Sequence, residues 1–291
     1  MKARIFLLFL AAALSSGARA YDLGDFLGIK PPKNGAEQPA TAGEPAPKPL
    51  NLDALTTLLA ARAPGEEARV GRQVAGDLLG AAPLVPDPRL QAYVNRMGRW
   101  VALQSGDNAV KWRFGVLDTP DINAFSAPGG YVFITLGLYR MLDNEAELAG
   151  VLGHEVAHVT QHDHMKILQQ STLISALGQA MGRQIKGSDQ VAQNLLGNGA
   201  EILARKLDKD AEFRADRLGM VYAARAGYDP WGLPLVLQKL AALPANDSRM
   251  ALLFKTHPSP AERLDALSQA IGSRFDQLGG PDLASRFYRI K

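Results

Sequence analysis

Three side chains capable of metal and proton chemistry, His154, Glu155 and His158, stand together inside an apolar run of the sequence. In an α-helix, residues four positions apart lie on one face, so the two imidazole rings can converge on a single ion such as Zn²⁺. Glu155 leaves the same end of the helix, beside that ion, where its carboxylate can take a proton from a metal-bound water. The alternative is an amphipathic helix that carries two structural histidines.

A third ligand has to come from elsewhere in the chain, because a catalytic zinc ion takes three protein ligands and keeps one position for water. The sequence has no cysteine, so this ligand is a histidine or a carboxylate. Glu212 and Asp216 are the best candidates, since they lie four positions apart in a predicted helix and share one face. One of them can bind the metal while the other orients a ligand histidine. A solvated acidic helix face is the alternative for this pair.

The first twenty residues predict a secretory signal. Lys2 and Arg4 precede an apolar stretch at residues 5–14 that is short for a membrane span, and Ala18-Arg19-Ala20 fits the rule for signal-peptide cleavage. We therefore expect an exported chain that begins near residue 21 and resides in the periplasm. An uncleaved membrane anchor is the alternative.

The charge of the chain argues against a nucleic-acid partner. The formal net charge is +3, and the predicted signal alone holds three basic residues and no acidic one. The exported chain is therefore close to neutral and lacks the basic surplus that binding to phosphates requires. Because there is no cysteine, the exported domain is stabilised by its core and a bound metal rather than by disulfides.

Composition and periodicity divide the chain into a signal at 1–20, a Pro-rich linker at 21–50, one folded domain at 51–275 and a loose tail at 276–291. The linker is rich in Pro, Ala, Gly and Glu and cannot bury a core. Inside the domain, a loop is predicted at 251–259. Apolar residues at helical spacing predict helices at 51–63, 66–79, 88–103, 137–142, 208–226, 230–243 and 260–271.

Three short segments with alternating apolar residues, at 111–117, 122–126 and 131–135, predict a three-stranded antiparallel meander. This sheet leads into the helix with the paired histidines. Residues 165–207 follow that helix and predict a core or lid hairpin, with a membrane contact as the alternative, because no apolar run there is long enough to span a bilayer. His162 and His164, near the end of the helix with the paired histidines, are predicted to be surface groups or partners of the C-terminal helix dipole rather than ligands.

Five sequence blocks occur in a fixed order along the chain: Asn123–Gly130, Gly137-Leu138, His154–His158, Glu212–Asp216 and Thr256–Arg263. Together they resemble the HtpX/CAAX-prenyl-protease family of zinc metallopeptidases, in its soluble exported BepA/LoiP-like branch. The resemblance implies an α+β fold: a mostly helical zincin-type peptidase domain with a small antiparallel three-stranded sheet beside the zinc helix.

The resemblance also implies a role for each candidate site residue. Glu155 would be the general base, and Asp216 would hydrogen-bond the ring of His154. His257 would approach the metal and block its open position; the alternatives are that it stabilises the oxyanion or only caps a loop. The ligands implied for one Zn²⁺ ion per chain are His154, His158 and Glu212. The implied substrate-binding residues, on a strand edge to which an extended peptide adds, are Asn123, Ala124, Phe125 and Ser126.

The function implied by the resemblance is that of a zinc-dependent metalloendopeptidase that hydrolyses unfolded or misassembled envelope proteins in protein quality control. Such polypeptides would be its partners, together with an association with the outer membrane. The alternative is a zinc-stabilised periplasmic chaperone or assembly factor with little or regulated proteolysis. The intact Glu155 favours the enzyme, because a pure binding protein has no use for that carboxylate.

Overall fold

The structure is a computed structural model that describes residues 65–169, 207–244, 246–274 and 279–290. These residues belong to one compact unit, Pro47–Lys291. The predicted signal, the Pro-rich linker, the helix at 51–63 and most of the segment at 165–207 lie outside the described residues. Among the helices that are described, none is both long enough and apolar enough to cross a bilayer.

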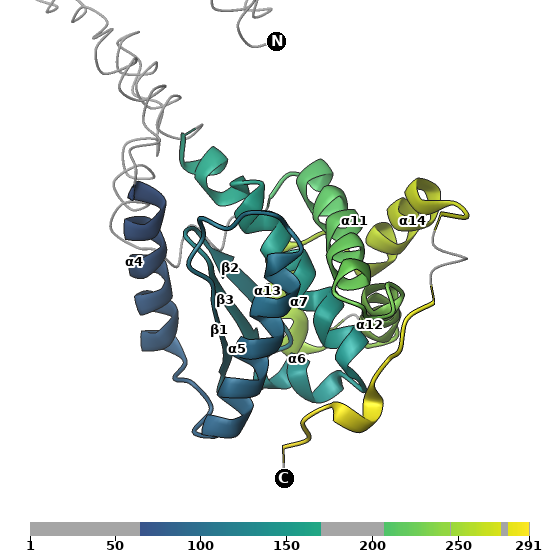
Figure 1. The fold of residues 1–291 in the computed structure, drawn as a ribbon, viewed down its shortest axis with the longest axis horizontal. Helices are drawn as coiled ribbons and strands as arrows, with labels where there is room; N and C mark the ends of the chain where they lie inside the picture. The colour runs from purple at the N-terminus through teal and green to yellow at the C-terminus, as the bar shows by residue number, and fades with distance from the viewer. Residues whose placement is uncertain (1–64, 170–206, 245, 275–278, 291) are drawn as a thin grey trace, which may run out of the picture. The chain divides into compact units, whose positions relative to one another are not determined.

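Helices surround a small sheet in the described part of the chain, as Figure 1 shows. A helix without a label begins at residue 163 and runs to residue 169, where the description stops. The predicted α+β class with mostly helical content is confirmed. The main elements in chain order are α4 (Glu66–Ala81), α5 (Pro88–Leu103), β1 (Arg113–Leu117), β2 (Ala124–Ala127), β3 (Tyr131–Thr135), α6 (Leu136–Met141), α7 (Glu145–Thr160), α11 (Lys209–Arg225), α12 (Gly232–Ala241), α13 (Ala251–Thr256) and α14 (Pro260–Ile271).

Polar side chains mark the starts of several helices. Asp87 accepts hydrogen bonds from the backbone N–H groups of Arg89 (2.9 Å) and Leu90 (3.1 Å) at the start of α5. Asn144 accepts one from the backbone N–H of Glu147 at the start of α7 (2.8 Å). These contacts satisfy donors that the first helical turn leaves free. Because the signal is local, the sequence predicts the start of α5 at residue 88 correctly.

The sheet is mixed, with the strand order β1-β3-β2. β2 and β3 form an antiparallel hairpin whose turn holds Gly129 and Gly130 at positive φ angles of 75° and 96°. β1 instead pairs with β3 in parallel, so the prediction that all three strands are antiparallel is wrong for β1. The tight turn places β2 directly next to β3. The longer connection after β1 leads to β2 at the opposite edge of the sheet, so β3 lies between them and runs parallel to β1. Among the described strands, β2 is therefore an edge strand.

The two faces of the sheet pack against different helices. One face packs against α4, where Leu117 and Phe133 meet Ala75. In Figure 1, α7 lies between the sheet and the helices α11 and α12, and almost all of it is buried. The other face of the sheet joins α5 and α7 in the main core through Phe114, Val116, Val132 and Ile134.

A pair of glycines brings α7 and α11 into backbone contact. A Cβ atom on Gly153 would lie 2.8 Å from the backbone oxygen of Gly219, and one on Gly219 would lie 2.8 Å from the backbone nitrogen of His154. Neither position leaves room for a larger side chain. The crossing therefore sets the distance between the two helices that carry the candidate metal ligands.

Two C-terminal predictions differ from the structure. The sequence predicts a loop at 251–259, but Ala251–Thr256 form α13, a helix too short to show an apolar period. The sequence also predicts a loose tail, yet Phe287 is only 6% exposed and its ring stacks on Tyr139 with centroids 5.1 Å apart. Partners so distant along the chain leave no local signal.

Candidate metal centre

His154 and His158 lie on one face of α7, as their four-residue spacing predicts. Their Nε2 atoms are 3.1 Å apart, and the two rings are perpendicular to each other. Both side chains are buried. The helix therefore brings two imidazole nitrogens to one point below the surface.

Glu212, in the first turn of α11, faces these two rings. One carboxylate oxygen is 3.7 Å from Nε2 of His154, and the other is 3.5 Å from Nε2 of His158. Glu212 is fully buried, and neither oxygen has a hydrogen-bond partner among the described residues. A buried carboxylate without such partners is costly, and a nearby cation would stabilise this one.

Asp216 holds the far side of the His154 ring, with Oδ1 2.8 Å from Nδ1. Arg263 of α14 donates to both oxygens of Asp216, from Nη2 at 2.5 Å and from Nε at 3.0 Å. Burial opposes the ionisation of Asp216, but Arg263 and His154 outweigh it and lower the pKa of this carboxyl below its usual range. Asp216 therefore stays charged and fixes the orientation of the ring.

Asp163 makes the corresponding contact to His158, with Oδ2 3.1 Å from Nδ1. Its Oδ1 accepts hydrogen bonds from Arg214 (3.0 Å) and Lys166 (3.1 Å). Burial opposes the ionisation of Asp163, but the contacts with His158 and Lys166 lower its pKa to about 2. Neither contact can be predicted from residue spacing. Asp163 lies past the end of α7, and Arg263 lies on α14, far from α7 and α11 along the chain.

These two carboxylates decide which ring nitrogen of each histidine carries the proton. With the Nδ1–H groups of His154 and His158 donating to Asp216 and Asp163, the Nε2 lone pairs face each other and Glu212. Such groups repel one another unless a cation lies among them. Together with His257 they form a cluster whose ligand atoms all lie within 4.8 Å of one another. The cluster can hold a divalent metal ion.

The charges of the cluster also shift its pKa values. Burial lowers the pKa of His158, but Glu212 and Asp163 outweigh this and raise it. Burial raises the pKa of Glu212. His257 behaves differently, since burial and the positive charge of Arg263 lower its pKa well below the usual value. His257 is therefore a neutral imidazole, the form that can bind a metal.

Glu155 is buried next to the cluster without belonging to it. It lines two small cavities, one shared with Asn123 and one shared with Ser126, and His257 borders both. Glu155 therefore borders the same cavities as His257 of the cluster and the residues at the start of the edge strand β2.

Residues 88–271 match the model of peptidase family M48, and this stretch includes every residue of the cluster. The chain belongs to peptidase family M48. The resemblance that the five sequence blocks predict is thus confirmed at the level of the family.

Several relatives of this M48 chain are named as proteases. The beta-barrel assembly-enhancing protease of Escherichia coli (strain K12) is 34% identical over 218 residues, which cover 71% of this chain and 44% of that protein. The mitochondrial metalloendopeptidase OMA1 of Schizosaccharomyces pombe is 29% identical over 179 residues, covering 61% and 52%. Metalloprotease YcaL of Escherichia coli is 30% identical over 173 residues, covering 59% and 67%. This chain spans less than half the length of the first relative.

In this M48 domain, the four residues predicted to bind substrate lie beside the cluster. Ala124, Phe125 and Ser126 belong to β2, whereas Asn123 precedes the strand. Asn123 is fully buried, and its Oδ1 accepts a hydrogen bond from the backbone N–H of Ala124 (3.0 Å). Its Nδ2 has no partner among the described residues. This donor is available to an acceptor that enters the adjoining cavity.

His164 is buried, so its prediction as a surface group is wrong. Its Nε2 lies 3.5 Å from Oγ of Ser126, and burial, together with the charge of His158, lowers its pKa to about 3. His162 just before it has a positive φ angle of 54° and pairs with Glu67 of α4 at 2.8 Å. The chain turns at His162, and this turn directs His164 inward.

Proposed function

We propose that this chain is a zinc-dependent endopeptidase in which His154, His158 and Glu212 bind one Zn²⁺ ion and Glu155 is the general base. The observation that carries the proposal is the carboxylate of Glu212, which faces both Nε2 atoms and has no hydrogen-bond partner among the described residues. Three nitrogen and oxygen ligands of this kind suit a catalytic zinc ion, which keeps a further position for water.

The proposed reaction is hydrolysis of a peptide bond. When bound, zinc supplies a Lewis acid that polarises the scissile carbonyl and lowers the pKa of a coordinated water. Glu155 accepts a proton from the attacking water as the water oxygen bonds to the carbonyl carbon. The same carboxyl then gives this proton to the leaving nitrogen as the C–N bond breaks.

The neighbouring residues would position ligands and substrate. Asp216 would hold His154 in the orientation that presents Nε2 to the metal, because its own charge is fixed by Arg263. An extended peptide would add to the edge of β2 through main-chain hydrogen bonds, which tolerate many sequences. Asn123 would offer its unpaired Nδ2 to a carbonyl of that peptide.

His257 would occupy the open position of the metal in the resting enzyme. Its Nε2 lies 3.9 Å from Glu212, and its Nδ1 lies 2.8 Å from Oγ1 of Thr256. A neutral imidazole held in this place can leave when a substrate carbonyl arrives. Stabilisation of the oxyanion is the alternative role for His257.

We further propose that the substrates are unfolded or misassembled envelope proteins and that the chain acts in the periplasm. The signal predicted at residues 1–20 supports export. The name of the relative from Escherichia coli, which refers to beta-barrel assembly, supports the choice of substrate class. Recognition through main-chain groups of β2 suits chains that have lost their fold.

Glu155→Gln tests the enzymatic role directly. The substitution removes the proton acceptor and keeps the size of the side chain, so cleavage of unfolded casein should fall by about 10²–10⁴-fold. Zinc content, measured on the purified protein, should stay at that of the wild type. Glu67→Gln makes the same chemical change on α4, outside the cluster, and should retain full activity.

Two results would contradict the proposal. Undiminished cleavage by the Glu155→Gln variant would rule out Glu155 as the general base. Cleavage of casein by protein that contains no bound metal would rule out a catalytic zinc site. Casein binding without cleavage, with equal rescue of envelope stress by wild type and variant, would indicate the chaperone instead.

A further inference from the structure

The outward face of the C-terminal half of α5 carries four exposed side chains: Arg96, Arg99, Trp100 and Leu103. Their spacing places them on one side of the helix. Trp100 is 50% exposed and Leu103 is 56% exposed, more than any other large hydrophobic residue in the described chain. Within those residues nothing covers this ridge, which we call the α5 ridge.

The α5 ridge is also positively charged. α5 contains three arginines and no acidic residue. The guanidinium groups of Arg96 and Arg99 are exposed and form no ion pair or hydrogen bond with any described residue. The charge of the α5 ridge is therefore available to a partner, and that partner has to be anionic.

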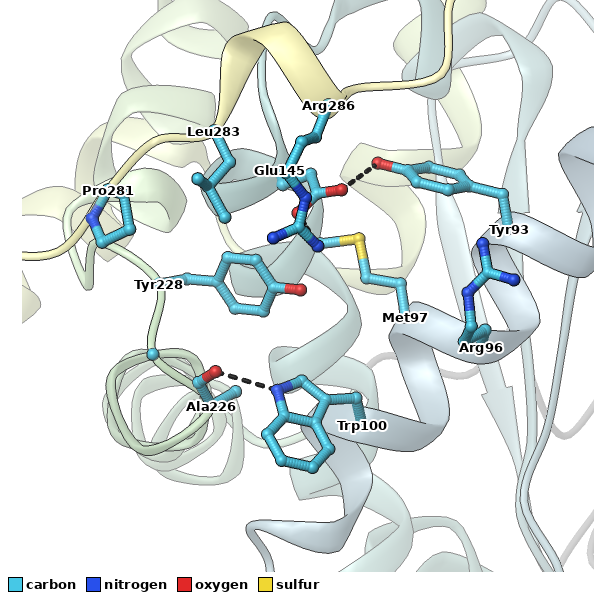
Figure 2. A pocket seen from close by; sticks show the side chains of 11 residues that line it. Tyr93, Arg96, Met97, Trp100, Glu145, Ala226, Tyr228, Pro281, Leu283 and Arg286 are labelled. Atoms are coloured by element: carbon cyan, nitrogen blue, oxygen red, sulfur yellow. Dashed lines mark hydrogen bonds and ion pairs between the residues drawn. The ribbon is translucent and has the colours of Figure 1, made fainter.

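A hollow of about 720 Å³ borders one side of the ridge, as Figure 2 shows. Arg96 and Trp100 line it from α5, and Arg286 lines it from the C-terminal segment. Its one acidic residue, Glu145, is buried, accepts a hydrogen bond from the Tyr93 hydroxyl (3.1 Å) and pairs with Arg286 (3.3 Å). Glu145 therefore offsets the charge of Arg286 and leaves Arg96 as the unpaired cation of the hollow.

A second hollow, of about 520 Å³, borders the other side of the ridge. Arg99 and Leu103 line it from α5, and Lys111 and Arg113 line it from the start of β1. Asp107 is its one acidic residue. The α5 ridge thus stands between two recesses that both carry more cationic than anionic side chains.

We propose that the α5 ridge docks on the surface of an anionic phospholipid bilayer. A convex helix face with apolar tips and flanking cations matches helices that lie in the plane of a membrane interface. Guanidinium groups bind phosphate in a bidentate manner, and tryptophan is favoured at the boundary between headgroups and acyl chains. An acidic polypeptide offers carboxylates to the arginines, whereas a bilayer offers both anionic headgroups and a continuous apolar layer for Trp100 and Leu103.

The contact of Trp100 with the rest of the fold explains how the ridge is held. Its Nε1 donates a hydrogen bond to the backbone oxygen of Ala226 (2.9 Å), which ties one edge of the indole to the end of α11. The ring is therefore fixed while its other edge stays exposed. Such a fixed ring loses little conformational freedom when it enters an interface.

Co-sedimentation with vesicles tests the proposal, using protein recovered from cells after normal processing. Wild type should bind phosphatidylglycerol vesicles more tightly than phosphatidylcholine vesicles, and less so at high salt. The double variant Arg96→Glu/Arg99→Glu should bind phosphatidylglycerol at least about tenfold more weakly. Trp100→Ser/Leu103→Ser should also weaken binding several-fold, and both variants should cleave casein normally.

The matched control is Trp231→Ser/Leu235→Ser on α12, which removes similarly exposed apolar residues from another helix and should bind vesicles as wild type does. In a variant with both Trp112 and Trp231 replaced by Phe, Trp100 is the one remaining tryptophan. Its fluorescence emission should shift to the blue on phosphatidylglycerol vesicles. Equal binding to both lipids, equal loss in the control, or no blue shift would overturn the proposal. Arginine-dependent binding to polyglutamate without vesicle binding would also overturn it and indicate an acidic polypeptide.

Discussion

The two carboxylates behind the histidines of α7 are held in different ways. Asp216 pairs with a buried arginine, so both of its oxygens are fixed inside the core. Asp163 pairs with Lys166 and Arg214, whose charged ends reach toward solvent. Removal of the Asp216 charge would leave Arg263 buried without its partner, whereas the partners of Asp163 can turn to water. Asp163 is therefore the carboxylate whose contribution can be measured in a folded protein.

Asp163→Asn should destabilise the protein by about 2 kcal/mol at neutral pH. The pKa of Asp163 is lowered from 3.8 to about 2 in the folded chain, so the unfolded chain takes up the proton first as the pH falls. The stabilisation is therefore complete above about pH 4 and is lost as the pH falls toward 2. Urea unfolding between pH 7 and pH 2.5 measures the difference in free energy of unfolding between wild type and variant. A difference of constant size over that range would contradict the prediction.

At the scale of the elements, the crossing of α7 and α11 sets the geometry of the metal-binding cluster. On α7, Gly153 is directly next to His154. On α11, its contact partner Gly219 lies about two turns from Glu212. Any increase in the distance between these helices moves the carboxylate away from the imidazoles. The helix packing and the ligand distances are therefore one property of the fold.

Gly219→Ala should separate these two helices. The new methyl group would meet the backbone of His154 at 2.8 Å, and overpacking of this kind costs about 1–3 kcal/mol. We expect lower thermal stability and weaker zinc binding, measured by titration with a competing chelator. Gly76→Ala on α4 is the control, because open space surrounds that position. It should stabilise the protein by about 0.5–1 kcal/mol and leave zinc binding unchanged. Equal effects of the two substitutions would contradict this reading of the crossing.

The elements also show what the sequence can and cannot predict. The apolar run around His154 predicts α7, and the four-residue spacing predicts that His154 and His158 share a face; both depend on neighbours along the chain. The parallel pairing of β1 with β3 depends on where a long connection leads, and the pattern of single strands does not encode this. The contact of Asp163 with His158 depends on the turn at His162, which no spacing rule covers.

At the scale of the whole molecule, the C-terminal segment returns to the start of α7. The backbone oxygen of Asp282 accepts a hydrogen bond from the N–H of Ala146 (3.1 Å), one of the donors that the first turn of a helix leaves free. Arg289 donates to the backbone oxygen of Asp143 (2.9 Å), just before that helix. The last described residues thus help to hold the opposite end of the helix that carries His154 and His158. Because these contacts join distant parts of the chain, the sequence predicts a loose tail in their place.

Phe287→Ala tests whether this segment is part of the folded core. Its ring packs against Tyr139 and Tyr93, and loss of a buried phenylalanine ring costs about 3–5 kcal/mol. For a domain of this size, such a loss lowers the melting temperature by on the order of 10 °C. Phe254→Ala removes the same ring from α13, where it is 36% exposed, and should shift the melting temperature much less. The Phe287 variant should still cleave casein at low temperature, because its ring lies outside the metal-binding cluster. Similar melting temperatures for the two variants would mean that the C-terminal segment contributes little to the stability of the fold.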